Sequence, residues 1–257
     1  MCAMSPRLLR PTPTGFDPRR ISGLELWLDA ADRAMVFDAD TGGSQVVADA
    51  GVGRWVDKSG KGRNFTQSDA NNRPLWRATG RNGRGTLEFD GSNDRLLGDA
   101  TQYFTSIAPF TFVMVHLVAS DAIVFPMLFT SKTDLTQNFQ IFNSTSGSYA
   151  DYSIGTNTGT ARTRYTTAAR NVWRYIFFDF VGSSPDAAAS YSGRSAKVGL
   201  TRATASAFAG MTHAEARISD SANVFKGQIS EVLIYSKVLS ASERDAVENY
   251  VTTKWAL

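Results

Sequence analysis

The chain has 257 residues, of which 42% are hydrophobic, and this is enough to bury a sizeable core in one large domain or two small ones. The net charge of +3 is small and most basic residues are scattered along the chain, so a nucleic-acid partner is not expected. The single cysteine, Cys2, excludes an intramolecular disulfide and a thiolate metal site within one chain. Frequent Phe, Gly, Ser and Thr residues favour a β-rich, turn-rich fold over a helical one.

Residues 1–20 predict an extended arm, because four prolines fix φ, remove hydrogen-bond donors and leave no periodicity. The arm is either a disordered tail or a segment that lies over a neighbouring subunit, and its apolar residues favour the second. The residues expected to bind such a partner are Arg7, Leu8, Leu9, Arg10, Phe16, Arg19 and Arg20. The N-terminus lacks the apolar core of a signal peptide, which predicts synthesis in a reducing cytoplasm. The most apolar stretch, 110–129, is interrupted by polar residues and a proline, so no membrane span is expected.

Strands are predicted where apolar residues alternate or run continuously between turn signals. The predicted strands span residues 21–29, 54–57, 86–90, 110–118, 124–129, 138–142, 172–181 and 228–235. Residues 68–85, which are polar and rich in arginine, are expected to form a loop. The strands 110–118, 172–181 and 228–235 are apolar on both faces, which is typical of central strands covered on both sides.

The C-terminal stretch predicts a strand followed by a capped helix. In the strand 228–235, Ile229, Leu233 and Tyr235 are expected to share one face. Ser240 and Glu243 have the spacing of a capping box, which predicts a helix from residue 240 to residue 254 with an apolar stripe on one side. This helix is expected to cover one doubly apolar strand. The other two then need further cover, from long loops or from neighbouring subunits, and this need favours a homo-oligomer.

Many strands with one terminal helix predict an all-β fold, a two-sheet antiparallel sandwich. No internal repeat and no break in composition divides the chain. The predicted organisation is therefore an extended Pro/Arg-rich arm at residues 1–20 and one domain at residues 21–257.

Four motifs resemble the laminin-G-like, concanavalin-A-like jelly-roll family, and they occur in the family's order. They are GLELWLDA at 23–30, WVDKSGKG at 55–62, LEFDG at 87–91 with Asp94, and FKGQISEVLIY at 225–235 with Ser240 and Glu243. The resemblance implies a concanavalin-A-like jelly roll in which the first and last strands lie close together. The family's Asn-Gly hairpin is replaced by YSGR at 191–194, so no ligand contact is carried over to that region.

The opening PRLLRP segment, at residues 6–11, resembles the arm of bacteriophage virion proteins that carry this domain. The resemblance implies a virion location after synthesis in the host cytoplasm, with other virion proteins such as the major capsid protein as partners.

Catalytic signals are incomplete. Glycosidases of this fold resemble a strand with Glu-x-Asp-x-x-Glu, which places two carboxylates on one face. Glu88 and Asp90 match the first two positions, but Asn93 occupies the third. His116 lies in an apolar strand and is read as a core residue, and His213 lacks a partner signal. We therefore expect no enzymatic activity.

The sequence offers weak candidates for two kinds of ligand, a calcium ion and a glycan. The family often binds calcium, and the weak candidates here are Asp57, Asn64, Asp90 and Asp94, which alternatively bond turn amides. No other cofactor or metal is expected. A glycan needs an exposed aromatic residue with polar neighbours, for which the candidates are Trp76, Tyr149 and Tyr152; Trp76 is alternatively a buried anchor beside Pro74.

The sequence thus predicts a non-enzymatic bacteriophage structural protein on the virion exterior that acts through protein–protein contacts. Capsid decoration or cementing is the first hypothesis, and a tail or fibre component is the second. A carbohydrate-binding module for host-surface glycans is the alternative from a different class.

Overall fold

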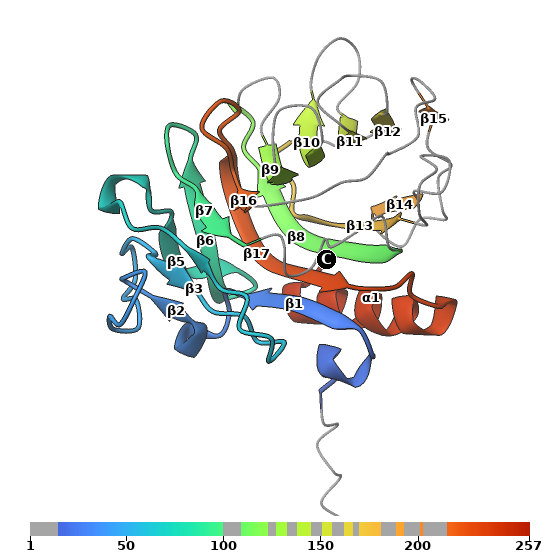
Figure 1. Ribbon diagram of the computed structural model, residues 1–257, viewed down its shortest axis with the longest axis horizontal. Helices are drawn as coiled ribbons and strands as arrows, with labels where there is room; N and C mark the ends of the chain where they lie inside the picture. The colour runs from blue at the N-terminus through green and yellow to red at the C-terminus, as the bar shows by residue number, and fades with distance from the viewer. Residues whose placement is uncertain are drawn as a thin grey trace, which may run out of the picture.

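The computed structural model describes residues 15–99, 109–122, 127–132, 138–144, 151–155, 162–166, 170–180, 189–192, 201–202 and 215–257. They form two antiparallel sheets and one α-helix, α1 (Ala241–Trp255) (Figure 1). This confirms the predicted all-β jelly-roll sandwich with a C-terminal helix. No helix in the described ranges has the length and apolar character needed to cross a bilayer.

The first sheet contains the strands that were predicted to be central. Its strand order is β14-β13-β8-β17-β6-β5, and β1 also pairs with β17. The bounds are β1 (Leu24–Asp29), β5 (Leu75–Arg81), β6 (Arg84–Asp90), β8 (Phe110–Val118), β13 (Arg174–Phe180), β14 (Ala189–Ser192) and β17 (Lys226–Tyr235).

The second sheet has the order β15-β12-β11-β10-β9-β16-β7-β4-β3-β2. Its strands are β2 (Val36–Phe37), β3 (Arg54–Trp55), β4 (Phe65–Thr66), β7 (Leu96–Gly98), β9 (Met127–Lys132), β10 (Asn138–Ser144), β11 (Asp151–Gly155), β12 (Arg162–Thr166), β15 (Thr201–Arg202) and β16 (Glu215–Ile218). Three short 3-10 helices are η1 (Pro18–Arg20), η2 (Arg33–Met35) and η3 (Ala70–Asn72).

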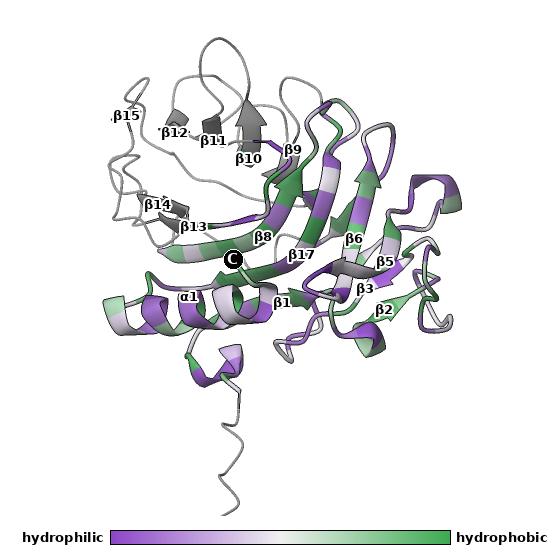
Figure 2. Cartoon of the chain, turned by 180° about the vertical axis from the view of Figure 1, so that it is seen from behind, coloured by the Kyte–Doolittle hydropathy of each residue, from purple (hydrophilic) through white to green (hydrophobic). Residues whose placement is uncertain are grey.

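Helix α1 covers the outer face of the first sheet, below the sheet in Figure 1. Its Val247, Val251 and Trp255 are fully buried and belong to one apolar cluster with residues of β1, β8, β13 and β17. The sheet residues of this outer cluster include Leu24, Trp27, Val113, Val115, Tyr175, Phe177, Leu233 and Tyr235. Figure 2 shows the apolar residues along β8 and β17 in green beside a helix whose ribbon alternates between purple and green.

One helix therefore covers all three doubly apolar strands at once. The expectation that two of them need cover beyond the helix was wrong, because β8, β13 and β17 are adjacent in the sheet and α1 lies across them. Their apolar faces are thus no ground for a homo-oligomer, which stays a prediction.

The helix starts as predicted. The Glu243 amide donates to the Ser240 hydroxyl at 3.3 Å, and the Ser240 amide donates to the Glu243 carboxylate at 3.0 Å. This reciprocal pair satisfies two amides that no helical carbonyl can reach. At the other end, Ala256 takes a left-handed conformation with φ of 53° and closes the last turn.

Strand β17 contains a bulge at Ser230 that alters its face pattern. The pairing with β8 shifts between Ile229 and Glu231. Ile229 consequently lies in the core between the sheets with Val232, whereas Leu233 lies under the helix. The predicted common face of Ile229 and Leu233 was wrong because one extra residue reverses the alternation.

The predicted loop at residues 68–85 contains a strand. β5 pairs with β6 as a hairpin whose turn residues, Asn82 and Gly83, have φ of 53° and 67°. Two successive positive φ values are the geometry of a tight hairpin turn that matches strand twist. This hairpin brings three polar side chains to the end of α1.

Candidate functional site

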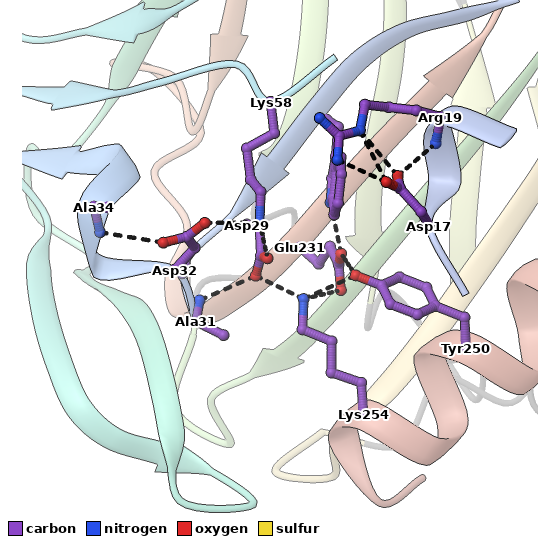
Figure 3. A network of polar contacts seen from close by, with 12 residues as sticks. Asp17, Arg19, Asp29, Ala31, Asp32, Ala34, Lys58, Glu231, Tyr250 and Lys254 are labelled. Atoms are coloured by element: carbon purple, nitrogen blue, oxygen red, sulfur yellow. Dashed lines mark hydrogen bonds and ion pairs between the residues drawn. The ribbon is translucent and has the colours of Figure 1, made fainter. Parts of the chain in front are cut away.

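Two carboxylates face each other beneath α1. Asp29 at the end of β1 pairs in register with Glu231 of β17, and both are nearly inaccessible to solvent. Like charges directly opposite on antiparallel strands repel. Lys254, on the last turn of α1, removes the conflict because its Nζ lies 2.7 Å from Asp29 Oδ1 and 3.1 Å from Glu231 Oε2 (Figure 3).

A second lysine completes the neutralisation of Asp29. Lys58 Nζ lies 2.8 Å from Asp29 Oδ2, 2.9 Å from Asp32 Oδ2 and 4.3 Å from the centre of the Trp27 ring. Burial alone would raise the pKa of the Asp29 carboxyl, but the ammonium groups of Lys254 and Lys58 outweigh it and hold that pKa below its usual value. Asp29 is therefore a permanently charged link between β1, the turn after β3 and α1.

Glu231 is enclosed by donors. Its Oε1 accepts from Trp27 Nε1 at 2.8 Å and from the Tyr250 hydroxyl at 2.6 Å, and its Oε2 accepts from Trp255 Nε1 at 2.6 Å. With Lys254 beside Oε2, both oxygens are saturated. Burial raises the pKa of this carboxyl against the opposing charge of Lys254. Glu231 therefore anchors the helix and does not face a substrate.

An open pocket of about 650 Å³ lies over this network, between residues 15–16, β1 and the outer side of α1. Its volume is in the range of small-molecule sites. The rings of Phe16 and Tyr250 lie 5.6 Å apart on its wall. The polar residues that line it include Lys58, Arg84, Asn249 and Thr253.

The β5–β6 hairpin clasps the C-terminal end of α1. Asn82 Nδ2 and Arg84 Nε each donate to the Lys254 carbonyl at 3.0 Å, and Arg81 donates to the carbonyls of Trp255 and Ala256. These carbonyls have no helical partner and carry the negative end of the helix dipole, so cationic donors suit them. These hydrogen bonds between the β5–β6 hairpin and the end of α1 place Arg84 at the rim of the pocket.

The residues predicted to bind a partner fall into two groups. Arg7, Leu8, Leu9 and Arg10 lie outside the described residues. The other three contact or flank this domain itself: Phe16 packs on Tyr250, Arg19 forms a fork with Asp17 and lies 5.7 Å from the Trp27 ring, and Arg20 is exposed.

The packed domain therefore begins before residue 21. Pro18 is buried, its carbonyl accepts from the Tyr235 hydroxyl at 3.4 Å, and Asp17 caps η1.

Of the three aromatic glycan candidates, Trp76 was wrong. It is 7% exposed in β5, and its Nε1 donates to the Ala30 carbonyl at 2.9 Å, so its ring offers no stacking face. Tyr149 lies outside the described residues, and so does the side chain of Tyr152, whose backbone belongs to β11.

The calcium candidates do not fit a cation. The Asp57 carboxylate accepts from the amides of Trp27, Ser59 and Arg63 and from the Ser59 hydroxyl, while Asn64 accepts from the Asp57 amide. Their oxygens are thus committed to the turn at 57–63.

Asp90 and Asp94 form a second turn of this kind. Asp90 accepts from the Ser92 amide, and Asp94 accepts from the Asp90 amide. Burial raises the pKa of Asp94 to about 7, because its neighbours add negative charge and not a compensating cation. Across the described ranges, no group of three or more His, Cys, Asp or Glu residues is arranged to hold a metal.

The two carboxylates that match the glycosidase motif, Glu88 and Asp90, also make structural contacts. Glu88 lies 2.7 Å from Arg77 and accepts from Gln228 at 3.2 Å, and Asp90 caps its turn. His116 is fully buried, and its pKa is lowered to about 3 by burial and by the charge of Arg174. None of these residues lines the pocket beside α1.

The network of Asp29, Lys58, Glu231 and Lys254 was not predicted from the sequence. A signal was present, because Glu231 is the only charged residue between Ile229 and Tyr235 in a strand that is apolar on both faces. A charge in such a strand requires a buried partner.

No protein-family model and no curated protein sequence matches this chain. Solved structures do resemble it. A sialidase from Trypanosoma rangeli superposes with a TM-score of 0.59 at 10% identity, covering 91% of this chain and 33% of the sialidase. The binding domain of botulinum neurotoxin serotype D superposes with a TM-score of 0.57 at 10% identity, covering 88% of this chain and 50% of that chain.

A third resemblance spans nearly a whole domain. Domain 4 of AbnA, a GH43 extracellular arabinanase from Geobacillus stearothermophilus solved in complex with arabinotriose, superposes with a TM-score of 0.57 at 12% identity. The match covers 88% of this chain and 97% of that domain, whereas the chain spans only a third of the sialidase and half of the toxin chain. At these identities the comparisons show the fold, which is a β-sandwich.

Proposed function

We propose that this chain is a non-catalytic carbohydrate-binding domain and that the pocket beside α1 is its binding site. The observation that carries the proposal is the composition of the pocket, in which the rings of Phe16 and Tyr250 lie beside exposed Asn249 and Thr253. Sugars present apolar C–H faces and hydroxyl groups together, and ligand sites meet such molecules with apolar walls and a few placed polar groups.

The arrangement of charge supports binding over hydrolysis. A glycosidase needs one carboxyl group free to donate a proton and a second free to act on the sugar. Here Glu231 accepts from Trp27, Tyr250, Trp255 and Lys254, and both oxygens of Asp29 are held by lysines. The resemblance to an arabinotriose-bound domain of the same extent adds support at the level of the fold.

The proposal is tested with a glycan array followed by calorimetry on the hits. The wild-type protein is expected to bind at least one glycan, and Asn249→Ala and Thr253→Ala are expected to bind it more weakly. Ser242→Ala is the matched control, since Ser242 is exposed on the same helix and does not line the pocket. A protein that binds no glycan contradicts the function, and glycan binding unchanged in both pocket variants contradicts the site.

Location on a virion, with the major capsid protein or another virion protein as partner, rests on the sequence of residues 1–20 and stays a prediction. Capsid decoration and a tail or fibre role are both compatible with a domain that attaches to host-surface glycans. The virion location is tested by deleting residues 1–14, a change that keeps all contacts of residues 15–20. Loss of incorporation into particles would support this location, and normal incorporation would contradict a role of the arm in it.

A further inference from the structure

We infer that the sugar bound in the pocket beside α1 carries an anionic group, a carboxylate or a sulfate, which Arg84 receives. This inference rests on the proposed function and specifies the class of its ligand. Most of the charged groups at the pocket already have hydrogen-bond partners within the protein.

The acceptors at the floor of the pocket are filled. The Asp29 carboxylate accepts from Lys58, from Lys254 and from the amide of Ala31. Glu231 lies behind it and has four donors. A ligand therefore finds no free carboxylate to which it could donate.

The N–H donors of Lys254 all have acceptors within the protein, and those of Lys58 have acceptors for all but one. Lys254 Nζ is engaged by Asp29, Glu231 and the Tyr250 hydroxyl, which uses all three of its N–H groups. Lys58 Nζ is engaged by Asp29 and Asp32, which leaves one N–H.

Arg84 holds the spare donors. It is exposed at the pocket rim, its Nε donates to the Lys254 carbonyl at 3.0 Å, and its terminal nitrogens make no hydrogen bond within the described part of the chain. The bond through Nε fixes the guanidinium before any ligand arrives, so less side-chain entropy is lost on binding. Among the charged groups of the pocket, donors without a partner therefore outnumber acceptors, and two oxygens of a carboxylate or a sulfate can accept from an arginine fork through two parallel bonds.

The test compares three trisaccharides of one linkage by calorimetry: α-1,4-linked trigalacturonate, neutral galactotriose, and galactotriose sulfated at O6. At least one acidic trisaccharide is expected to bind about tenfold more tightly than the neutral one, since a hydrogen bond to a charged group is worth about that factor. The preference is expected to shrink with added NaCl, because Arg84 is exposed. The carboxylated and sulfated arms distinguish the two sources of charge.

The variants separate Arg84 from charge in general. Arg84→Gln keeps a donor for the Lys254 carbonyl but lacks the cationic fork, and it is expected to lose the acidic preference while its Tm stays near that of the wild type. Arg33→Gln is the matched control: Arg33 is also exposed and also donates through Nε to a backbone carbonyl, that of Val46 at 2.7 Å, but it lies outside the pocket lining. Arg33→Gln is expected to keep the preference.

Two results would overturn the inference and leave carbohydrate binding intact: equal affinity for acidic and neutral sugars, or an acidic preference that survives Arg84→Gln. A wild-type protein that binds none of the three trisaccharides and no glycan on the array contradicts the proposed function, and the inference fails with it. Neutral glycans alone as array hits overturn only the inference.

Discussion

Glu231 places a charge beside the apolar cluster under α1 and depends on four neighbouring donors to hold it. In Glu231→Gln, Lys254 loses one of its two carboxylates, and the new amide NH2 must face either the Trp27 donor or the Trp255 donor, because those donors contact different oxygens of Glu231. We expect the free energy of unfolding to fall by about 3 kcal/mol, the size seen when one partner of a buried ion pair is removed. Urea unfolding measures this change.

The control for that prediction is Asp49→Asn. Asp49 also pairs with a cation, Arg77, but its side chain is 67% exposed, so the change is expected to stay within about 0.5 kcal/mol. Equal effects of the two substitutions would show that the buried position of Glu231 carries no special stability.

His116 predicts a dependence of stability on pH. Its pKa is about 3 in the folded protein and about 6.5 in an unfolded chain, so the unfolded state binds more protons between these values. Its contribution is fully present above pH 6.5 and is lost as the pH falls, by about 1.4 kcal/mol per pH unit. Asp94, with a pKa raised to about 7, acts in the opposite sense between pH 4 and 7.

The measurement is therefore the difference between two proteins. Chemical unfolding of the wild type and of His116→Leu from pH 7 to pH 4.5 is expected to give a smaller loss of stability on acidification in the variant. Parallel profiles would show that His116 does not remain neutral in the fold.

At the scale of elements, the capping box sets the start of α1. Ser240→Ala removes the hydroxyl that accepts from the Glu243 amide, and a loss of about 1 kcal/mol in unfolding free energy is expected. Ser242 is exposed two residues further along, and Ser242→Ala removes only a 3.2 Å contact between two hydroxyl groups and leaves the bond from the Glu243 amide to Ser240 in place, so it is expected to change stability by less than about half as much. Thermal and urea unfolding compare the two, and equal losses would contradict a role for the cap.

Elements with a clear period could be predicted from the sequence, and elements without one could not. β8, β17 and α1 were found because long apolar runs or a helical stripe specify them. β5 was missed because Arg77, Thr79 and Arg81 give it a polar face, although Asn82-Gly83 is a strong hairpin signal. The bulge at Ser230 leaves no trace in a strand that is apolar on both sides.

The site was harder to predict for a related reason. Asp29 and Glu231 meet only because of the register between the first and last strands of the sheet, and Lys254 reaches them from the helix. Asp29 and Glu231 are separated by about two hundred residues, so no local sequence pattern predicts that they are in contact. The turn at Asp57, by contrast, could be predicted because all its partners except Trp27 lie within seven residues.

For the whole molecule, residues 15–20 pack on the domain, so a deletion that includes them is expected to lower its stability. Removing residues 1–20 takes away the Phe16 ring from Tyr250 and the buried Pro18 from Tyr235. We expect a loss of about 2 kcal/mol, or a Tm lower by about 4–8 °C, from the lost apolar burial. Calorimetry on the full chain and on the deleted protein measures it, and an unchanged Tm would contradict the packing of this segment.

Strand β17 pairs with three other strands, and this affects the order in which the first sheet can form. The strand pairs with β8 along one edge, and along the other edge with β6 through its first half and with β1 through its second half. The strand that joins these three is synthesised after all of them. During synthesis, the edges of β1, β6 and β8 that pair with β17 therefore stay without that partner until residue 235 has emerged, and β1 and β17 are separated by about two hundred residues. Pairing between strands so far apart in the sequence is slow, and until it occurs the unpaired strand edges can associate with other chains.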